Sequence, residues 1–313
     1  MHPAYSVILF TTASGAGYGL LFWTALALVA GRLPAGGALA PTALTLALAL
    51  VTAGLLASTK HLGHPERAWR AFSQWRSSWL SREGVAAVAT YGPAGLLWLA
   101  TLLGLSGGWV DALALLSAAG AAVTVFCTAM IYASLRTIRQ WHTPLVAPVY
   151  LSLAAATGAV LAALLLALFG HSVALAAAVA TLSLVLAGAL KLTYWRGIDR
   201  DDGAYTPEMA TGLGDIGKVR VLDPPHTQPN YVMREMGYQV ARKHAQKLRR
   251  IAVLALFAVP LGLTVLALAL GAGVGLFLLY ATLSAALGVV VERWLFFAEA
   301  DHMAMLYYGA ERA

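Results

Sequence analysis

Residues 147–170 read APVYLSLAAATGAVLAALLLALFG, a run that contains no Asp, Glu, Lys, Arg or His. A helix needs about 20 predominantly apolar residues to cross the hydrocarbon core of a bilayer, so this stretch predicts a membrane-spanning helix. Seven other stretches have the same character. The predicted spans, eight in all, are residues 5–30, 42–59, 84–104, 112–133, 147–170, 173–195, 251–271 and 274–297.

The composition of the whole chain agrees with these spans. Hydrophobic residues make up 60% of the 313 residues and charged residues 11%, whereas soluble domains have about 25% charged residues. The first span does not have the pattern of a signal peptide, because its apolar run is long and the first basic residue, Arg32, follows it. We therefore predict an all-α integral membrane protein in which residues 1–313 form a single eight-helix transmembrane domain.

The positive charges gather on one side of the predicted bundle. Of the 21 Lys and Arg residues, all except Arg32 lie on or next to the side that carries both termini and the loops 60–83, 134–146 and 196–250. By the positive-inside rule that side faces the cytoplasm, so both termini are expected there. The net charge of +7 then reflects topology and attraction to lipid headgroups rather than nucleic-acid binding.

Residues 60–83, KHLGHPERAWRAFSQWRSSWLSRE, concentrate polar and aromatic side chains between the second and third spans. Gly63 and Pro65 end the preceding span, and proline is well placed as the first residue of a new helix. At about 100° per residue, one arc of that helix is aromatic and holds Trp69, Phe72, Trp75 and Trp79. This predicts a helix lying in the membrane interface. Anchoring explains the arc, but Arg76 falls inside it, which favours an anionic or planar partner.

Glu83 stands at the mouth of the third predicted span. An ionisable group in that position is costly unless it is paired or functional. Two interpretations stay open: an ion pair with Arg82 or Lys60, and a proton carrier. His61 is the expected companion of a proton carrier, because an imidazole can donate to a carbonyl oxygen or shuttle a proton near neutral pH.

An imidazole, a carboxylate, arginines and tryptophans at one membrane surface suit a quinone. Its planar head group stacks on aromatic rings, its carbonyl oxygens need hydrogen-bond donors, and its reduction takes up protons. The loop after the fourth span offers an opposite wall, although interfacial anchoring explains that loop equally well. We expect His61 and Glu83 to carry the chemistry, within a quinone site made of His61, His64, Arg67, Trp75, Arg76, Trp79, Glu83, Tyr132, Arg136 and Trp141.

Resident metal centres are not expected. None of the eight histidines lies in the middle of a span, whereas a haem buried between helices normally needs axial histidines there. One haem near the surface, held by His61, His64 or His142, stays open as an alternative. The single cysteine, Cys127, is too few for an iron–sulfur cluster.

The loop 196–250 is long enough to dock a soluble partner. It contains a formal G-x-G-x-x-G match at residues 212–217, but no strand is predicted before it, so a surface turn is favoured over a dinucleotide site. Tyr231–Arg250 is predicted to be a helix entering the seventh span. In the last span, Glu292 and Arg293 are expected to pair with each other or across helices.

His61-Leu62-Gly63-x-Pro65-x-Arg67-Ala68, followed by Trp75-Arg76-x-Ser78-Trp79-Leu80-Ser81-Arg82-Glu83, resembles the signature of the dimethyl sulfoxide reductase anchor-subunit family. The resemblance covers the whole chain. It implies a subunit of a three-part molybdoenzyme in the bacterial inner membrane, with iron–sulfur clusters and molybdopterin only in the partner subunits. It also implies that His61 and Glu83 occupy the family's quinol-binding positions.

The long loop 196–250 resembles that of the anchors of cytoplasmic sulfite dehydrogenases in the same family. The resemblance implies electron transfer from an iron–sulfur subunit to ubiquinone or menaquinone, driven by sulfite oxidation in a partner subunit. The anchor would carry the quinone half-reaction and would not act on the sulfur substrate. Three alternatives stay open: quinol oxidation feeding a dimethyl sulfoxide-type reductase, a haem b cytochrome subunit, and a secondary transporter using Glu83 and Glu292.

Overall fold

The computed structural model describes residues 3–33, 36–60, 62–201, 205–223, 227–237, 240–271 and 273–313, with the side chains of 240–243 left out. It confirms the all-α prediction, since these residues include no strand, and it confirms all eight predicted spans. Six spans are the helices α1 (Tyr5–Val29), α2 (Leu39–Thr59), α3 (Trp79–Leu102), α4 (Gly108–Ala133), α5 (Val146–Leu168) and α6 (Ala174–Arg200). The last span is α11 (Val274–Ala298).

The seventh span is assembled from three consecutive helical segments. They are α9 (Val240–Ala252), a π-helical turn η2 (Val253–Ala258) and α10 (Val259–Leu270). A π-helical turn closes its hydrogen bonds over five residues instead of four and therefore holds one residue more than an α-turn. Leu256 and Phe257 of this turn are buried, and the Phe257 ring faces Gly188 of α6.

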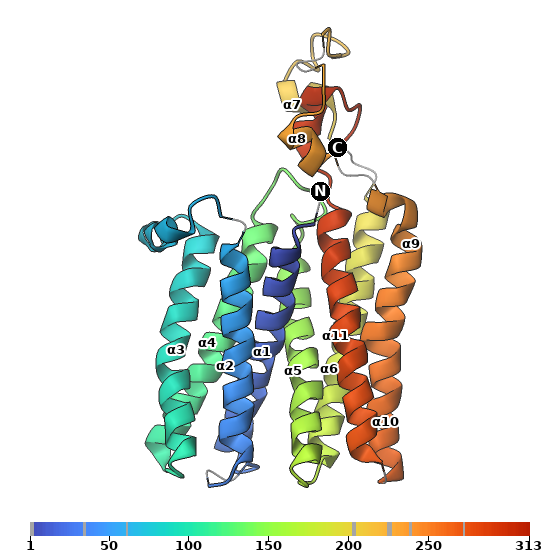
Figure 1. The fold of residues 1–313 in the computed structure, drawn as a ribbon. Coiled ribbons are helices and arrows are strands. Elements are labelled where there is room, and N and C mark those ends of the chain that lie inside the picture. The colour runs from blue at the N-terminus through green and yellow to red at the C-terminus, as the bar shows by residue number, and fades with distance from the viewer. Residues whose placement is uncertain are drawn as a thin grey trace.

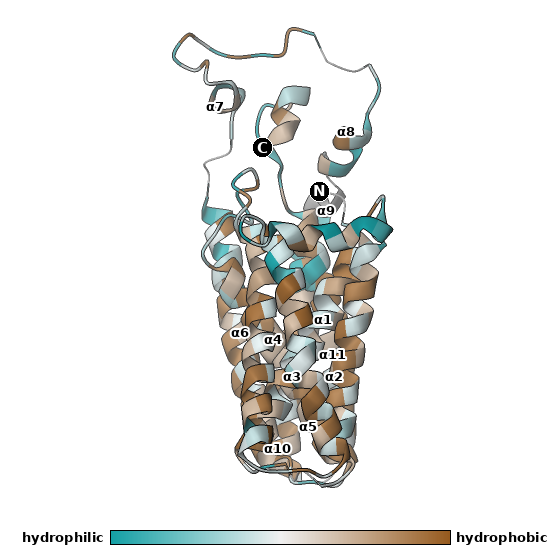
Figure 2. Ribbon diagram, turned by 90° about the vertical axis from the view of Figure 1, so that its left-hand side faces the viewer, coloured by the Kyte–Doolittle hydropathy of each residue, from teal (hydrophilic) through white to brown (hydrophobic). Residues whose placement is uncertain are grey.

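The helices run alternately up and down, and the two ends of the bundle differ. One end, at the top of Figure 1, carries both termini and the long loop after α6, and we call it the loop end. The opposite, short-loop end carries brief connections such as those between α1 and α2 and between α5 and α6. The flanks of the bundle are apolar, and polar residues gather at the loop end (Figure 2). The chain is therefore a multi-pass membrane protein.

Helix α1 lies at the centre of the bundle, where it contacts α2, α4, α5 and α11. The closest approach is between α1 and α5: a Cβ added to Gly19 would collide with the carbonyl oxygen of Ala154, and one added to Gly158 would collide with the backbone of Gly19. Gly17 faces α2 at a somewhat larger separation, where a Cβ would be 2.7 Å from the carbonyl oxygen of Ala47. Such close approach of backbones at small residues is typical of helix packing in membranes.

The segment after α2 differs from the single amphipathic α-helix expected there. A 3-10 helix, η1 (Pro65–Gln74), lies beside the loop end of α3 and is followed by a turn (Figure 1). Helix α3 then begins at Trp79, five residues before the predicted start of the span, because Ser78 caps it by accepting the backbone N–H of Ser81. The expectation that Trp79 continues the arc of Trp69 and Phe72 is therefore wrong.

Side chains of α3 hold this segment in place. The Ser81 hydroxyl donates to the carbonyl oxygen of Ala71, and the Arg82 guanidinium donates to the carbonyl oxygens of Trp75 and Arg76 at 3.0 and 2.7 Å. The Phe72 ring covers Gly84, where a Cβ would lie 2.9 Å from the ring. The segment is therefore tied to the start of α3 by its backbone, while most of its side chains stay exposed.

The long loop folds against the C-terminal segment at the loop end. It contains two short helices, α7 (Pro207–Thr211) and α8 (Tyr231–Met236), which pack on a 3-10 helix, η3 (Met303–Tyr308). Tyr205 and Ala313 exchange backbone hydrogen bonds of 2.8 and 3.1 Å, and the Tyr307 hydroxyl donates to the carbonyl oxygen of Ala210 at 2.8 Å. We call this unit, residues 205–223, 227–237 and 302–313, the extramembrane lobe.

Two expectations for the long loop are settled by this lobe. The helix predicted for residues 231–250 is divided, because α8 ends at Met236 and α9 is described from Val240 onward. The glycines of the G-x-G-x-x-G match shape a turn, as expected: Gly212 has φ of 69°, and the Glu208 carboxylate accepts the backbone N–H of Val219 at 2.9 Å. Among the described residues no strand precedes this turn.

The α1–α5 contact generates a test of the bundle's packing. Gly19→Ala and Gly158→Ala are each expected to lower the free energy of unfolding by about 1–3 kcal/mol, because neither backbone can move aside for a methyl group. Unfolding in mixed micelles with increasing denaturing detergent measures the change. Gly262→Ala in α10 is the matched control, since nothing lies within 4 Å of its added Cβ. Equal stability of all three variants would contradict the close contact.

Candidate functional site

Glu83 lies in the second turn of α3 and is buried, with 5% of its surface exposed. Its carboxylate accepts a hydrogen bond from the hydroxyl of Thr128 on α4. Among the described residues it makes no ion pair: Arg82 directs its guanidinium to backbone carbonyls, and Lys60 forms no salt bridge. The structure therefore does not support the paired interpretation of Glu83 that the sequence left open.

Two aromatic rings, one from α3 and one from α4, pack together close to the start of α3. The Trp79 ring meets Phe126 of α4 edge to face, with 5.9 Å between the ring centroids. The Arg82 guanidinium lies 4.2 Å from the centroid of the Trp79 ring, within the range of a cation–π interaction. Phe126 and Leu80 are exposed on the flank of the bundle, where they face lipid. We call the region around Trp79, Arg82, Glu83 and Phe126 the mouth of α3 and α4.

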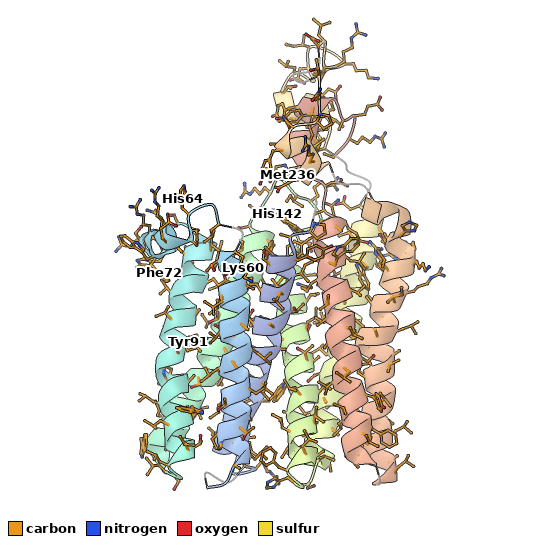
Figure 3. The ribbon with its side chains drawn as sticks, viewed as in Figure 1. Lys60, His64, Phe72, Tyr91, His142 and Met236 are labelled. Carbon is orange, nitrogen blue, oxygen red and sulfur yellow. The ribbon has the colours of Figure 1, made fainter. Side chains whose placement is uncertain are left out.

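The remaining predicted site residues of the 60–83 stretch are not gathered around Glu83. His61 lies outside the described residues. His64 is 67% exposed at its side chain and bonds Glu66 through Nδ1 at 3.0 Å, while Arg67 lies 3.6 Å from the same carboxylate. In Figure 3, His64 stands on the outer side of this segment and Phe72 lies nearer to α3.

Trp75 and Arg76 are also exposed and contact each other. The Arg76 guanidinium lies 5.5 Å from the centroid of the Trp75 ring, and 52% of the Trp75 surface is exposed. Among the described residues no hydrogen bond or ion pair joins either side chain to Glu83. These two side chains are positioned to meet lipid headgroups or a ligand arriving from the membrane surface.

Tyr132 and Trp141, predicted as the opposite wall, are packed into a buried aromatic cluster. The Trp141 indole stacks on Phe296 of α11 at 5.4 Å and donates its N–H to the carbonyl oxygen of the same residue at 2.9 Å. Tyr132 stacks on Tyr150 of α5 at 5.9 Å. Arg136, by contrast, is exposed, and its carbonyl oxygen accepts the Tyr205 hydroxyl at 2.6 Å.

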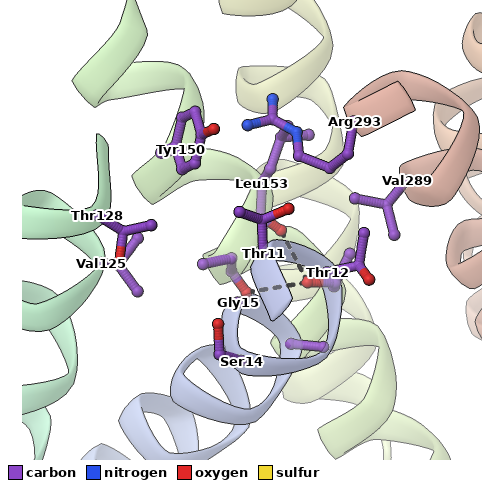
Figure 4. Close-up of a pocket in the computed structure, with 13 residues that line it drawn as sticks. Thr11, Thr12, Ser14, Gly15, Val125, Thr128, Tyr150, Leu153, Val289 and Arg293 are labelled. Carbon is purple, nitrogen blue, oxygen red and sulfur yellow. Dashed lines mark hydrogen bonds between the residues drawn. The ribbon is translucent and has the colours of Figure 1, made fainter. Parts of the chain in front are cut away.

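A small cavity with both polar and apolar walls lies between Thr128 on α4 and Arg293 on α11. Figure 4 shows Thr128 on one wall, Arg293 and Tyr150 on another, and Thr11 and Ser14 of α1 below them. The space open to the centre of a water molecule is about 20 Å³, which is room for about one water molecule. Its hydroxyl groups are the partners that such a water needs.

Beyond this cavity lies a cluster of three fully buried charges. Arg293 binds Glu292 with two hydrogen bonds of 2.5 and 2.8 Å, and Lys191 of α6 forms an ion pair with the same carboxylate. Lys191 and Glu292 have no exposed surface and Arg293 has 2%. The predicted pairing of Glu292 and Arg293 is confirmed, within one helix and across helices.

Aromatic rings enclose these charges. The Lys191 ammonium lies 4.3 Å from the centroid of the Tyr194 ring and 4.7 Å from that of Trp195, and the Arg293 guanidinium lies 4.1 Å from that of Tyr150. The two cations and one carboxylate have a net charge of +1, which the negative faces of the rings partly offset. Sequence reasoning missed Lys191 and Thr128; the signal for Lys191 was a lone lysine inside an apolar span.

Together these groups form a polar line through the loop-end half of the bundle. It runs from Glu83 to Thr128, across the water-sized cavity to Arg293, and on to Glu292 and Lys191. All of its members are buried. Ionisable side chains are rare within membrane domains, and those present are usually paired or functional.

Comparison with known proteins identifies the class. The chain belongs to the DMSO reductase anchor subunit family, whose sequence profile matches residues 1–298. It is also similar to a sulfite dehydrogenase subunit from Allochromatium vinosum, with 36% identity over 332 aligned positions that cover 98% of this chain and 99% of that protein.

The buried charge cluster generates a rank order of stabilities. Glu292→Gln leaves two cations facing each other without a carboxylate and is expected to cost about 3–5 kcal/mol of unfolding free energy. Lys191→Met leaves the neutral Glu292–Arg293 pair and is expected to cost about 1 kcal/mol. The double variant should lie between them, because it leaves one cation.

The measurement is unfolding in mixed micelles for the three variants and the parent chain under one set of conditions. All three variants lose the Lys191–Glu292 ion pair, so differences in their stability reflect the net charge that remains in the cluster. If Glu292→Gln were no more destabilising than Lys191→Met, the carboxylate would not be the group that neutralises both cations.

Proposed function

We propose that this chain is the membrane anchor of a molybdenum-containing oxidoreductase and passes electrons between an iron–sulfur subunit and quinone at the mouth of α3 and α4. The observation that carries the proposal is the buried Glu83 carboxyl, which has a hydroxyl donor and no cation in an ion pair among the described residues. An unpaired carboxylate is costly in a membrane domain. A group that can bind a proton and become neutral avoids that cost.

The residues at this mouth fit a quinone head group. Trp79 and Phe126 supply aromatic surface that is accessible from the flank of the bundle, and a protonated Glu83 supplies a donor for a carbonyl oxygen. Arg82 places a positive charge 4.2 Å from the Trp79 ring, where it favours negative charge that develops on the ring oxygens. Bound quinone would supply the two-electron chemistry.

The protein's own part in this reaction is to hold and move protons. Glu83 carries a proton on its carboxyl group, and the Thr128 hydroxyl fixes the orientation of that group. His61, which lies outside the described residues, is 22 positions earlier in the chain and is proposed as the second proton-transferring group. Thr128 also lines the water-sized cavity, so its side chain lies between Glu83 and that space.

Sulfite oxidation in a partner subunit is the proposed source of electrons, supported by the similarity to a sulfite dehydrogenase subunit along nearly the whole chain. The family's name supports electron transfer in the opposite direction, in which quinol oxidation supplies electrons for the reduction of dimethyl sulfoxide or a related acceptor. The transporter alternative has less support, because α3 and α11, which carry Glu83 and Glu292, are continuous helices.

The extramembrane lobe is the proposed docking surface for the iron–sulfur subunit. It stands above the loop end, on the side that carries nearly all of the basic residues. We place that side, and both termini, in the cytoplasm of a bacterium, because the positive-inside rule requires it of short basic loops such as 134–146. The membrane is then the inner membrane.

Substitutions at Glu83 and Thr128 in the assembled complex test the site. Glu83→Gln is expected to lower quinone-linked turnover about 100-fold, because it removes the proton-transferring group. Thr128→Val should lower it about tenfold, because the carboxyl group loses its hydrogen bond. The measurement is turnover with a quinone analogue beside turnover with a soluble dye that takes electrons from the partner subunits.

Asp111→Asn is the matched control, an exposed carboxylate at the short-loop end of α4. It should leave both activities unchanged. Normal quinone-linked turnover in Glu83→Gln would remove the carboxyl group from the reaction. A parallel loss of dye-linked turnover would indicate failed assembly rather than a lost quinone site, and His61→Ala, judged by the same two assays, would then decide whether this stretch binds quinone.

A further inference from the structure

A second and much larger cavity lies at the short-loop end, between α1, α2, α5 and α6. Its volume is about 430 Å³, within the range of about 300–1,000 Å³ that is usual for ligand-binding pockets. The walls are mainly apolar, and six of the side chains that line it are Leu26, Ala43, Ala162, Leu166, Ala176 and Val179. It lies at the opposite end of the bundle from Glu83 and has no part in the proposed quinone reaction.

The rim of this pocket is polar and positively charged. Arg32, from the connection between α1 and α2, and His171 and Ser172, from the connection between α5 and α6, all line it and are exposed. Arg32 is the one Lys or Arg in the connections at this end, and His171 is the one histidine there. Two separate connections therefore bring their basic side chains to the same opening.

The position of Arg32 runs against the charge distribution of the rest of the chain. Basic residues are disfavoured on the side opposite the positive loops, so topology does not account for Arg32. Among the described residues Arg32 forms no ion pair. The one carboxylate in the sequence near this end, Asp111, belongs to α4, which does not line the pocket.

We propose that this pocket binds an anionic phospholipid of the adjacent leaflet, with an acyl chain between the helices and the phosphate at Arg32 and His171. Charge complementarity selects the head group, because a guanidinium binds phosphate oxygens with two parallel hydrogen bonds. The apolar walls select the acyl chain. The helices that form these walls are long and apolar enough to cross the membrane, so the pocket lies at the depth of the lipid acyl chains.

A quinone fits this pocket less well than a lipid does. Its two carbonyl oxygens need donors facing the ring. The indole N–H of Trp23 is already bonded to the carbonyl oxygen of Ala155 at 2.8 Å, which leaves the single hydroxyl of Thr24 among the donors deep in the pocket. The donors that face the opening are at the rim, where a phosphate would lie. The bound acyl chain would fill space between α1, α2, α5 and α6 that protein side chains leave open.

Lipid retention by the purified complex tests this proposal. The complex is placed in nanodiscs of phosphatidylglycerol or of phosphatidylcholine, extracted into detergent, and examined by native mass spectrometry for phospholipid that stays bound. We expect retained phosphatidylglycerol, and about tenfold weaker retention in Arg32→Gln, which loses a charged hydrogen-bonding partner. Arg220→Gln, an exposed arginine of the extramembrane lobe, is the matched control and should retain the lipid normally.

Substitutions that fill the cavity provide a second, independent test of the proposal. Ala162→Phe and Ala43→Phe each place a ring in the pocket from a different helix and should abolish retention of both lipids. Two variants are used so that misfolding of one, seen by size-exclusion chromatography, leaves the other to decide. Unchanged retention in the folded variants would overturn the pocket. Equal retention of the two lipids by the parent complex, or extraction of quinone instead of phospholipid, would overturn the proposed ligand.

Discussion

Hydrocarbon cannot hydrate a charge, so the protein itself must neutralise every ionised group that it buries within a membrane. The loop-end half of this bundle meets that constraint at the cluster of Lys191, Glu292 and Arg293, where one carboxylate serves two cations and aromatic rings cover the remainder. The cluster joins α6 to α11, and Arg293 also reaches α5 through the Tyr150 ring. Positions of three helices are thus set by one requirement for charge balance.

Glu83 differs from this cluster, because among the described residues no cation forms an ion pair with it. The difference between the two carboxylates indicates different roles. The carboxylate of Glu292 is matched by two cations, whereas that of Glu83 has a threonine hydroxyl and, on the other side of Thr128, a cavity for about one water molecule. A permanently paired carboxylate is suited to holding helices together. A carboxyl group with weak partners is suited to exchanging a proton, as the proposed quinone site requires.

Much of the fold follows from composition alone, because a span needs only length and apolarity. That is why eight spans, and the end of the bundle at which each loop lies, were predictable.

Element boundaries at polar segments were less predictable than the spans. Periodicity at 60–83 suggested one α-helix, but a serine N-cap at Ser78 and side-chain bonds from Arg82 divide it into a 3-10 helix and an early start of α3. The candidate site divides in the same way: Glu83 and the Glu292–Arg293 pair were recognised because charges in apolar spans are conspicuous, although Lys191, a charge of the same kind, was missed. Thr128 could not, since a threonine is common in such spans and its importance comes only from facing Glu83 across two helices. Tyr132 and Trp141 show the converse, because their aromatic character suggested a pocket wall and the structure packs them against Phe296 instead.

The π-helical turn at 253–258 has a consequence for how the seventh span tolerates insertions and deletions. On its loop-end side, Arg249 of α9 binds Asp199 at 2.7 Å and Glu299 at 2.7 Å, which ties α9 to α6 and to the end of α11. The extra residue of the turn fixes the direction in which Arg249 points relative to the apolar face of α10. Losing one residue there would rotate Arg249 by about 100° relative to α10, so the turn acts as a spacer that keeps two halves of one span in register with different neighbours.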